Sequence, residues 1–219
     1  MAKTVLRVIP TFYPYKIKKG PEAKIINQFG EWTAIYFEDN RWGSHIALIK
    51  GEMNSLKGKE AVFLRIDSGC YTGAVLGDLQ CDCVQQLHEA MSIIKRLKSG
   101  LIIFIPGHEA RGYGLLSKLQ SFRIQDREKV GTVTAFRKLG LNPPDIRSYE
   151  GVALIVNKLG IVSVNLLSNN PNKVSQLRKY GIKVNKMIPI LIRPTKLTRI
   201  HLKEKEEKLG HRGLITKFH

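Results

Sequence analysis

Runs of apolar residues divide the chain into short predicted strands and amphipathic helices. In the first third, three runs separated by Gly, Asn and Lys have the short, partly alternating pattern typical of strands in a meander, at residues 33–37, 46–50 and 62–66. Apolar residues within 84–98 recur at spacings of three and four, which predicts a helix with one apolar face. The first third is therefore expected to be mainly β-sheet.

From residue 100 onward the pattern alternates between strands and helices. Residues 101–105 are apolar throughout, which predicts a strand buried on both faces in the middle of a sheet. Two helices are predicted within 113–139 and another over 149–158, followed by a strand over 161–167. This alternation predicts an α/β fold.

Charge is the unusual feature of the composition. The 219 residues include 36 Lys and Arg against 18 Asp and Glu, so the formal net charge is +18. This excess predicts a polyanionic partner, and nucleoside triphosphates, nucleic acid and acidic membrane surfaces all qualify. No apolar run approaches the roughly 18 residues of a membrane span, so a soluble protein is expected.

The two ends of the chain are also basic. Residues 1–20 carry five basic residues and no acidic ones, and Pro10 and Pro14 would interrupt the amphipathic helix of a transit peptide. We interpret this as a cytoplasmic chain with a basic extension. Residues 183–219 hold ten Lys or Arg and three Glu.

All three cysteines fall within 14 residues, as Cys70, Cys81 and Cys83. A Cys-x-Cys pair can chelate one metal ion, and the segment between the first two cysteines is long enough to return the third thiolate to it. Three ligands plus water are the arrangement of a catalytic zinc site, whereas a fourth protein ligand makes the site structural. Three buried, inert thiols are one alternative, and a fourth ligand from one of the six histidines is another.

Two loops after predicted strands contain residues suited to anions. Ser168 and Lys173 lie at a helix start that Asn170 can cap, where free N–H groups could hold phosphate, although this loop alone favours an ordinary capped helix. In the other loop, Glu109 could accept from the amide and amine of a base, and Arg111 could clamp a phosphate. A solvent-exposed ion pair is the alternative for these two residues.

Together these residues resemble the GTP cyclohydrolase II family over about residues 22–211. The three-cysteine spacing and the Asn-Asn-Pro loop are the specific signals. The matching motifs are, in chain order, Arg65, Cys70-x-Thr72-Gly73, Cys81-Asp82-Cys83, Gln86-Leu87, Glu109-x-Arg111, Gly114-Leu115, Lys118, Gln125-Asp126, Leu139-Gly140, Asp145-x-Arg147, Leu159-Gly160, Asn169-Asn170-Pro171 and Lys208-x-Gly210-His211.

The resemblance implies a fold and an activity. The fold would be a mixed α/β sheet flanked by helices, with an N-terminal antiparallel β region. One catalytic domain would span 21–211, between the basic extension at 1–20 and a tail at 212–219. The activity would be a zinc-dependent opening of the imidazole ring of GTP with release of formate and pyrophosphate, the first step of riboflavin biosynthesis. Magnesium would accompany the phosphates, and a homodimer is typical of the family.

The family's residue roles carry over to matching positions. Cys70, Cys81 and Cys83 would hold the zinc. Arg147 is implied as a nucleophile on the α-phosphorus and Asp145 as its proton acceptor, although a guanidinium with a pKa above about 12 acts at least as an electrostatic clamp. The positions implied to contact GTP are Arg65, Gln86, Glu109, Arg111, Thr132, Ser168 and Lys173, and alignment at Thr132 needs a one-residue insertion.

The chain departs from the family pattern at several positions. Asp67 and Gly69 replace a His and a Glu before the first cysteine, and His108 and Ala110 replace a Gln and a Gly beside Glu109. Phe122 stands where the family commonly has a tyrosine near the metal, which removes a phenolic donor and keeps the ring.

These departures keep three interpretations open. The enzyme could complete the family reaction, because another group replaces the missing hydroxyl. It could instead stop at the formamidopyrimidine nucleotide or act on another nucleotide. A reading from another class is a zinc-stabilised nucleic-acid-binding protein that uses the basic residues of 183–217, although no nucleic-acid-binding motif supports it.

Overall fold

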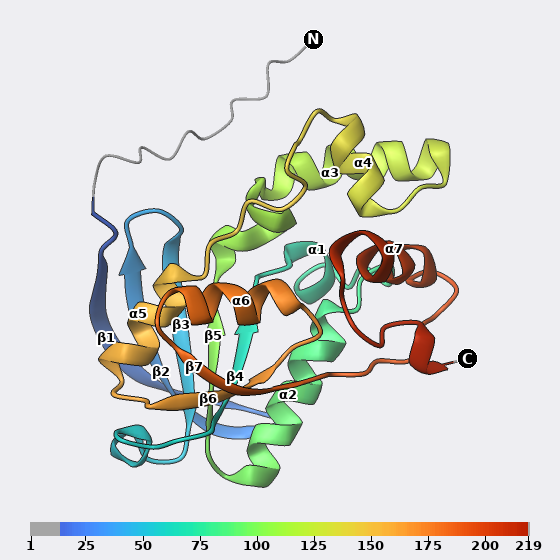
Figure 1. Ribbon diagram of the computed structural model, residues 1–219. Coiled ribbons are helices and arrows are strands. Elements are labelled where there is room, and N and C mark those ends of the chain that lie inside the picture. Colours follow the sequence, from blue (N-terminus) through green and yellow to red (C-terminus); the bar gives the residue numbers. More distant parts are fainter. Residues whose placement is uncertain (1–13, 219) are drawn as a thin grey trace.

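A computed structural model describes residues 14–218, which form one seven-stranded mixed sheet with helices on both faces (Figure 1). The strands lie in the order β1-β2-β3-β5-β4-β6-β7 across the sheet. They are β1 (Ile17–Asn27), β2 (Gly30–Asp39), β3 (Gly43–Lys50), β4 (Val62–Asp67), β5 (Gly100–Phe104), β6 (Ser163–Leu167) and β7 (Lys183–Ile188).

The helices follow the strands in an alternating order. The α-helices are α1 (Tyr71–Ala74), α2 (Cys83–Leu97), α3 (Gly114–Glu128), α4 (Thr132–Lys138), α5 (Glu150–Lys158), α6 (Pro171–Lys179) and α7 (Arg199–Leu209). Three short 3₁₀ segments are η1 (Met53–Leu56), η2 (Pro106–Gly112) and η3 (Thr216–Phe218). In Figure 1, α3 and α4 extend beyond the sheet, and α7 packs against α4.

The sheet has an antiparallel half and a parallel half. Strands β1, β2 and β3 form an antiparallel meander that pairs with β5, whereas β5, β4, β6 and β7 are mutually parallel. Parallel neighbours need crossover connections, which α2 and α6 supply between β4 and β5 and between β6 and β7. The carboxyl ends of the parallel strands therefore meet at one edge. The predicted fold class is confirmed.

The central strand β5 contributes to the core on both of its faces. Leu101 and Ile103 pack in the larger core with α5 and α6, while Ile102 packs on the other face with Met91 and Ile94 of α2. All three β5 residues are fully buried. This alternation explains why the strand is apolar at every position, and it confirms the predicted central strand.

Apart from the four-residue helix α1 and the 3₁₀ segments, three elements have no counterpart in the sequence prediction. Strand β1 lies at the edge of the sheet with most of its side chains exposed, so it lacks an apolar alternation. Strand β7, at the other edge, has one buried side chain, Val184. Helix α7 is polar around most of its surface and buries only His201, Leu202 and Glu204. Short or polar elements of this kind give weak periodicity signals.

The basic ends fall partly outside the described residues. Residues 1–13 lie outside them, and β1 begins at Ile17, inside the predicted extension. In the tail, Leu214 and Ile215 pack against Leu202 of α7. Within residues 14–218 no helix combines the length and apolar character needed to span a membrane.

Candidate active site

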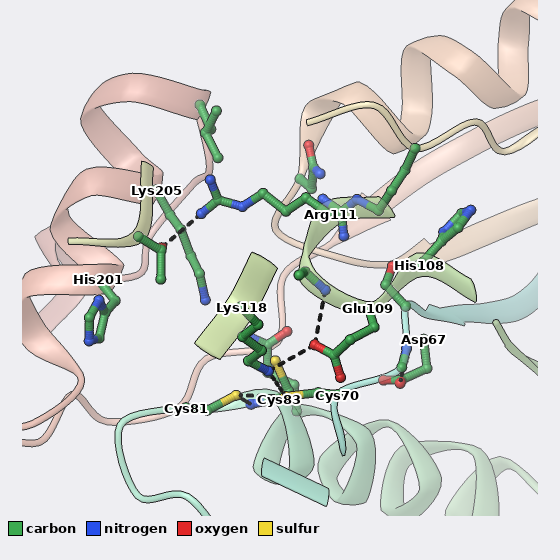
Figure 2. Close-up of a pocket in the computed structure, with 18 of the residues that line it drawn as sticks. Asp67, Cys70, Cys81, Cys83, His108, Glu109, Arg111, Lys118, His201 and Lys205 are labelled. Atoms are coloured by element: carbon green, nitrogen blue, oxygen red, sulfur yellow. Dashed lines mark hydrogen bonds and ion pairs between the residues drawn. The ribbon is translucent and has the colours of Figure 1, made fainter. Parts of the chain in front are cut away.

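The predicted site residues converge on one pocket at the carboxyl edge of the parallel strands (Figure 2). Its walls come from the ends of β4 and β6, the start of α2, the loop after β5, and α3, α4, α6 and α7. Eleven of the twelve predicted residues line it, and the twelfth, Asp145, is bound to Arg147 in its wall. A site beyond the carboxyl ends of parallel strands is where α/β folds place their ligands.

The three cysteines meet at one end of this pocket. Cys70 precedes α1 and Cys83 begins α2, so two short connections return the chain to the same point. The sulfur atoms all lie within 4.8 Å of one another, with 3.4 Å between those of Cys70 and Cys81. A Cβ atom at Gly73 would lie 3.0 Å from the Cys81 sulfur and 3.1 Å from that of Cys70. A glycine at this position therefore leaves room for the cluster.

The sulfurs suit a thiophilic metal ion. Hydrogen bonds with Cys81 and Cys83, together with the Lys118 ammonium, lower the pKa of Cys70, whereas hydrogen bonding and burial raise the pKa of Cys83. Among residues 14–218, no His, Asp or Glu joins the trio at this spacing. Three sulfur ligands fit zinc and leave a coordination position for water. The predicted trio is thus brought together, without the fourth ligand of a structural site.

Lys118 and Glu109 link the cysteine cluster to the loop after β5. The Lys118 ammonium donates to the Cys70 sulfur at 3.0 Å and to Glu109 Oε1 at 2.9 Å (Figure 2). The other carboxylate oxygen accepts from the backbone N–H of Tyr71 at 2.6 Å, and Oε1 also accepts from that of Ala110 at 2.9 Å. Three donors thus surround Glu109, which fixes the Cys70 loop. The contact of Glu109 with the purine base of a nucleotide stays a prediction.

Arginines and a lysine line the same pocket, and Figure 2 shows Arg111 set apart from the cysteines. Arg65 donates to Gln86 at 3.2 Å, and Arg111 donates to Thr132 at 2.9 Å. Within the described part of the chain, Arg65 Nε and Arg111 Nη1 are buried and have no hydrogen-bond partner. Buried donors normally have acceptors, so these two point to an anionic ligand.

Lys173 is buried at the start of α6, where the sequence predicted an anion site. Asn170 caps the helix by accepting from the N–H of Asn172 at 2.9 Å, and Ser168 accepts from that of Asn170 at 3.1 Å. Lys173 Nζ donates to the carbonyl of Ile66 at 2.8 Å. Burial, reinforced by the nearby arginines, lowers the pKa of Lys173 well below its usual value. A bound anion would restore its charge.

Asp145 and Arg147 form a two-point ion pair. Arg147 donates through Nε at 2.9 Å and through Nη2 at 2.5 Å to the two carboxylate oxygens. Burial opposes the charge of Arg147, but Tyr149 and Asp145 outweigh it and raise the pKa of the guanidinium. In the same way, Arg147 outweighs burial and lowers the pKa of Asp145. This geometry keeps Arg147 protonated, which suits a clamp better than a nucleophile.

Comparison with known proteins agrees with these residues. The GTP cyclohydrolase II family matches residues 18–189. Over 190 residues, the chain is 36% identical to a GTP cyclohydrolase-2 from Picrophilus torridus, covering 87% of this chain and 96% of the relative. The chain belongs to the GTP cyclohydrolase II family.

Other relatives differ in length. A GTP cyclohydrolase-2 from Streptomyces coelicolor is 39% identical over 84% of this chain and 80% of its own. The riboflavin biosynthesis protein RibBA of Endomicrobium trichonymphae is 38% identical over 84% of this chain, which spans 44% of that protein. A solved structure of RibBX, a two-domain 3,4-dihydroxy-2-butanone 4-phosphate synthase from A. baumannii, has a TM-score of 0.36 at 16% identity, covering 69% of this chain and 34% of that one.

The structure accounts for one departure of this family member from the family pattern. Gly69 has a φ of +60°, and a Cβ atom there would lie 3.0 Å from both the Ile105 carbonyl oxygen and the Pro106 Cα. A glutamate would not fit this backbone without a shift. Asp67 is buried beside it, accepting from Gly69 N at 3.3 Å and from Arg65 at 3.5 Å. Phe122 also lines the pocket, and its place near a metal stays a prediction.

Helix α7 and the turn after it supply pocket residues to which the sequence analysis gave no role. His201, Lys205 and His211 line the pocket, and burial lowers the pKa of His211 to about 3, so its ring is neutral. Lys205 donates to Asp82 at 3.1 Å, and Asp82 accepts from Gln86 at 2.5 Å. The Lys208-x-Gly210-His211 motif was a signal for this helix, but the motif alone does not indicate what the helix contacts.

Proposed function

We propose that this chain is a zinc-dependent GTP cyclohydrolase II that opens the imidazole ring of GTP and releases formate and pyrophosphate in riboflavin biosynthesis. One observation carries the proposal: three sulfurs within 4.8 Å of one another share a pocket with one buried arginine, two half-buried arginines and a buried lysine. That combination pairs a site for a hydrolytic metal with a site for polyphosphate. Membership of the family supports the same reaction.

The cations are assigned to the nucleotide. Arg65, Arg111 and Lys173 offer buried donors that an anion would satisfy, and Arg147 stays charged beside Asp145. We assign these four residues to the phosphates, with Mg²⁺ accompanying them. The net charge of +18 would draw a tetra-anionic substrate toward the pocket.

The cysteine end is assigned to the chemistry at the base. Zinc bound by Cys70, Cys81 and Cys83 would lower the pKa of a water to about 7 and polarise the purine ring. Lys118 holds Cys70 by a hydrogen bond, and Glu109 holds both Lys118 and the loop after Cys70. Arg147 would stabilise the negative charge that develops at the α-phosphate as pyrophosphate leaves.

An absorbance scan with GTP tests the proposal. Purified, zinc-loaded protein with Mg²⁺ is expected to remove the purine chromophore and to release formate and pyrophosphate in equal amounts. An unchanged spectrum under reducing conditions would contradict the assigned reaction. A gel shift with RNA at physiological salt is the control for the basic surface, because nonspecific polyanion binding weakens steeply as salt rises.

A second outcome is supported by Phe122. This residue lines the pocket and lacks the hydroxyl that the family's tyrosine would offer. The enzyme would then open the ring and keep the formyl group on a formamidopyrimidine nucleotide. Loss of the purine spectrum without formate would support this outcome. The Phe122→Tyr variant should then release formate, whereas stoichiometric formate from the natural protein would exclude it.

We also propose a homodimer in the cytoplasm, as the family resemblance implies. Exposed apolar side chains flank the pocket at Val75, Leu76 and Leu79 of the cysteine loop and at Leu116 of α3. Their exposed fractions lie between 66% and 73%. Apolar surface of this kind is typical of a contact with another chain. Light scattering of the purified protein measures the oligomeric state.

A further inference from the structure

Helix α7 follows residues 18–189, over which the family was matched, and only the Lys208-x-Gly210-His211 motif extends the resemblance to it. We propose that α7 and the turn after it act as a strap that holds the two ends of the pocket in place, and that Glu204 and Lys205 are its positioning residues. The effect on catalysis rests on the proposed function, whereas the effect on the structure does not. Three separate contacts support the strap.

The first contact joins Glu204 to the start of α4. Its carboxylate accepts from the backbone N–H of Val133 at 2.9 Å and of Thr134 at 3.4 Å, and also from the Thr134 hydroxyl. These are N–H groups that the first turn of a helix leaves without partners. Lys208, one turn later on α7, donates to Glu204 at 2.7 Å and neutralises it. Glu204 therefore acts as a cap supplied from another helix.

Gly131 makes this contact possible. A Cβ atom at Gly131 would lie 2.3 Å from a Glu204 carboxylate oxygen, so an alanine there would force the Glu204 side chain to move. The backbone of Gly131, at φ −84° and ψ 176°, is one that alanine adopts freely. Space for the carboxylate, and not backbone freedom, is therefore what a glycine provides at this position.

The capped turn carries a residue assigned to the substrate. Thr132 follows Gly131, and its hydroxyl accepts from Arg111 Nη2 at 2.9 Å. The other terminal nitrogen of Arg111 is buried and has no partner among the described residues. By fixing the turn, Glu204 fixes the group that aims Arg111 at an incoming anion.

The second contact joins Lys205 to the cysteine loop. Lys205 donates to Asp82, the residue between two of the proposed zinc ligands, at 3.1 Å. Asp82 in turn accepts from Gln86, and Gln86 accepts from Arg65. Neighbouring residues of one helix thus reach the α4 turn on one side and the metal loop on the other.

The third contact closes the strap on the Asn-Asn-Pro loop. Arg212 N donates to the Asn169 carbonyl at 3.0 Å, and Asn169 Nδ2 donates to the Arg212 carbonyl at 3.2 Å. Gly210 ends α7 with a φ of +66°, which lets the chain turn toward that loop. The Lys208-x-Gly210-His211 motif therefore has a structural role. Lys208 neutralises Glu204, Gly210 ends the helix, and the chain after it turns back toward Asn169.

The matched pair Glu204→Gln and Glu207→Gln tests the first contact. Glu207 lies on the same helix, but its side chain is 56% exposed and its one ion pair among residues 14–218 is with Lys203. E204Q is expected to raise KM for GTP about tenfold, to change kcat less, and to speed hydrogen exchange of the α4 amides, because a charge-assisted cap is lost. E207Q should do none of these. Equal behaviour of the two variants would overturn the proposal.

Gly131→Ala provides an independent test. Alone, it should displace Glu204 and speed α4 exchange as E204Q does. In an E204A background the same substitution should add nothing, because the carboxylate it clashes with has gone. A harmless G131A in the natural background would show that Glu204 does not occupy this turn.

Lys205→Met and Lys203→Met separate the strap from the enzyme assignment. K205M is expected to release zinc to a chelator several times faster, and K203M, at an exposed position, should not. Unchanged zinc release in K205M would overturn the second contact. Should the natural protein fail to open GTP, the proposed function fails, while exchange and zinc release still decide the strap.

Discussion

The two ends of the pocket are built in different ways. The cysteine end comes from one stretch of 14 residues, with its three cysteines on a loop and two adjoining helix starts. The cationic end takes Arg65 from β4, Arg111 from the loop after β5, Arg147 from before α5 and Lys173 from α6. The first is set by local chain geometry, whereas the second exists only once the sheet and its helices have assembled.

This difference predicts that a substitution at one end of the pocket impairs zinc binding or nucleotide binding, but not both. The largest effect is expected from Cys81→Ser, which should abolish zinc binding at equimolar metal and lower ring opening by roughly a thousandfold or more. Nucleotide binding should survive, because the cations come from other elements. Metal analysis, GTP turnover and equilibrium binding of a nonhydrolysable GTP analogue measure the three quantities. Loss of nucleotide binding together with zinc would contradict the separation.

The cationic end should give the opposite pattern. Arg147→Met should lower kcat about a hundredfold, the size expected when one preorganised donor is removed from a developing charge. Zinc content should remain at one per chain. Arg147→Lys is the matched control, because it keeps the charge and loses the two-point pairing with Asp145. If R147K matched the natural protein, the paired geometry would be irrelevant.

Lys118 contacts the cysteine end of the pocket but belongs to α3, which is remote in sequence from the cysteines. It therefore tests whether the cysteine end also depends on tertiary packing. Lys118→Met removes the ammonium that lies 3.0 Å from the Cys70 sulfur, and zinc affinity should change about tenfold to a hundredfold. Competition with a chelator and the cobalt–thiolate absorption of the Co²⁺-substituted protein report this without turnover. Lys138→Met, on an exposed pair with Glu128, is the control. Identical zinc affinity in both variants would remove Lys118 from the site.

The smallest effect concerns His108, which packs between Trp42 and Tyr149 and has both ring nitrogens without partners among residues 14–218. Burial first, and then the charge of Arg147, lowers its pKa well below 6.5 in the folded protein. The unfolded chain therefore takes up the proton first as the pH falls below 6.5. Stability should decline by up to about 1.4 kcal/mol per pH unit from this residue.

His108→Gln should remove that contribution and keep the others. Denaturant unfolding between pH 7 and pH 5 is expected to show a shallower loss of stability in the variant, since His45, His201 and His211 titrate in both proteins. Parallel curves for the two proteins would mean that His108 is hydrated and free to protonate in the fold.

Elements with a strong apolar pattern were predictable and polar ones were not. Strand β5 and helix α2 could be located from their sequence. Strand β5 is buried on both faces and is apolar at every position, whereas α2 is buried along one face and is apolar at helical spacing. Strand β1 is exposed along most of its length, so its residues carry no such pattern. Helix α7 escaped prediction for the same reason, although it completes the pocket.

The sequence by itself determined the cysteine end, since a Cys-x-Cys pair and a third cysteine 11 residues earlier constrain one another over a short chain. It also identified the residues of the cationic end, through their family resemblance. Only the tertiary structure decided how those residues are used. Glu109 is held by three protein donors, Arg147 is paired to Asp145, and Glu204 reaches a turn about 70 residues away that only Gly131 leaves open. Contacts between distant segments depend on how the sheet and helices pack, and no local pattern of residues records that.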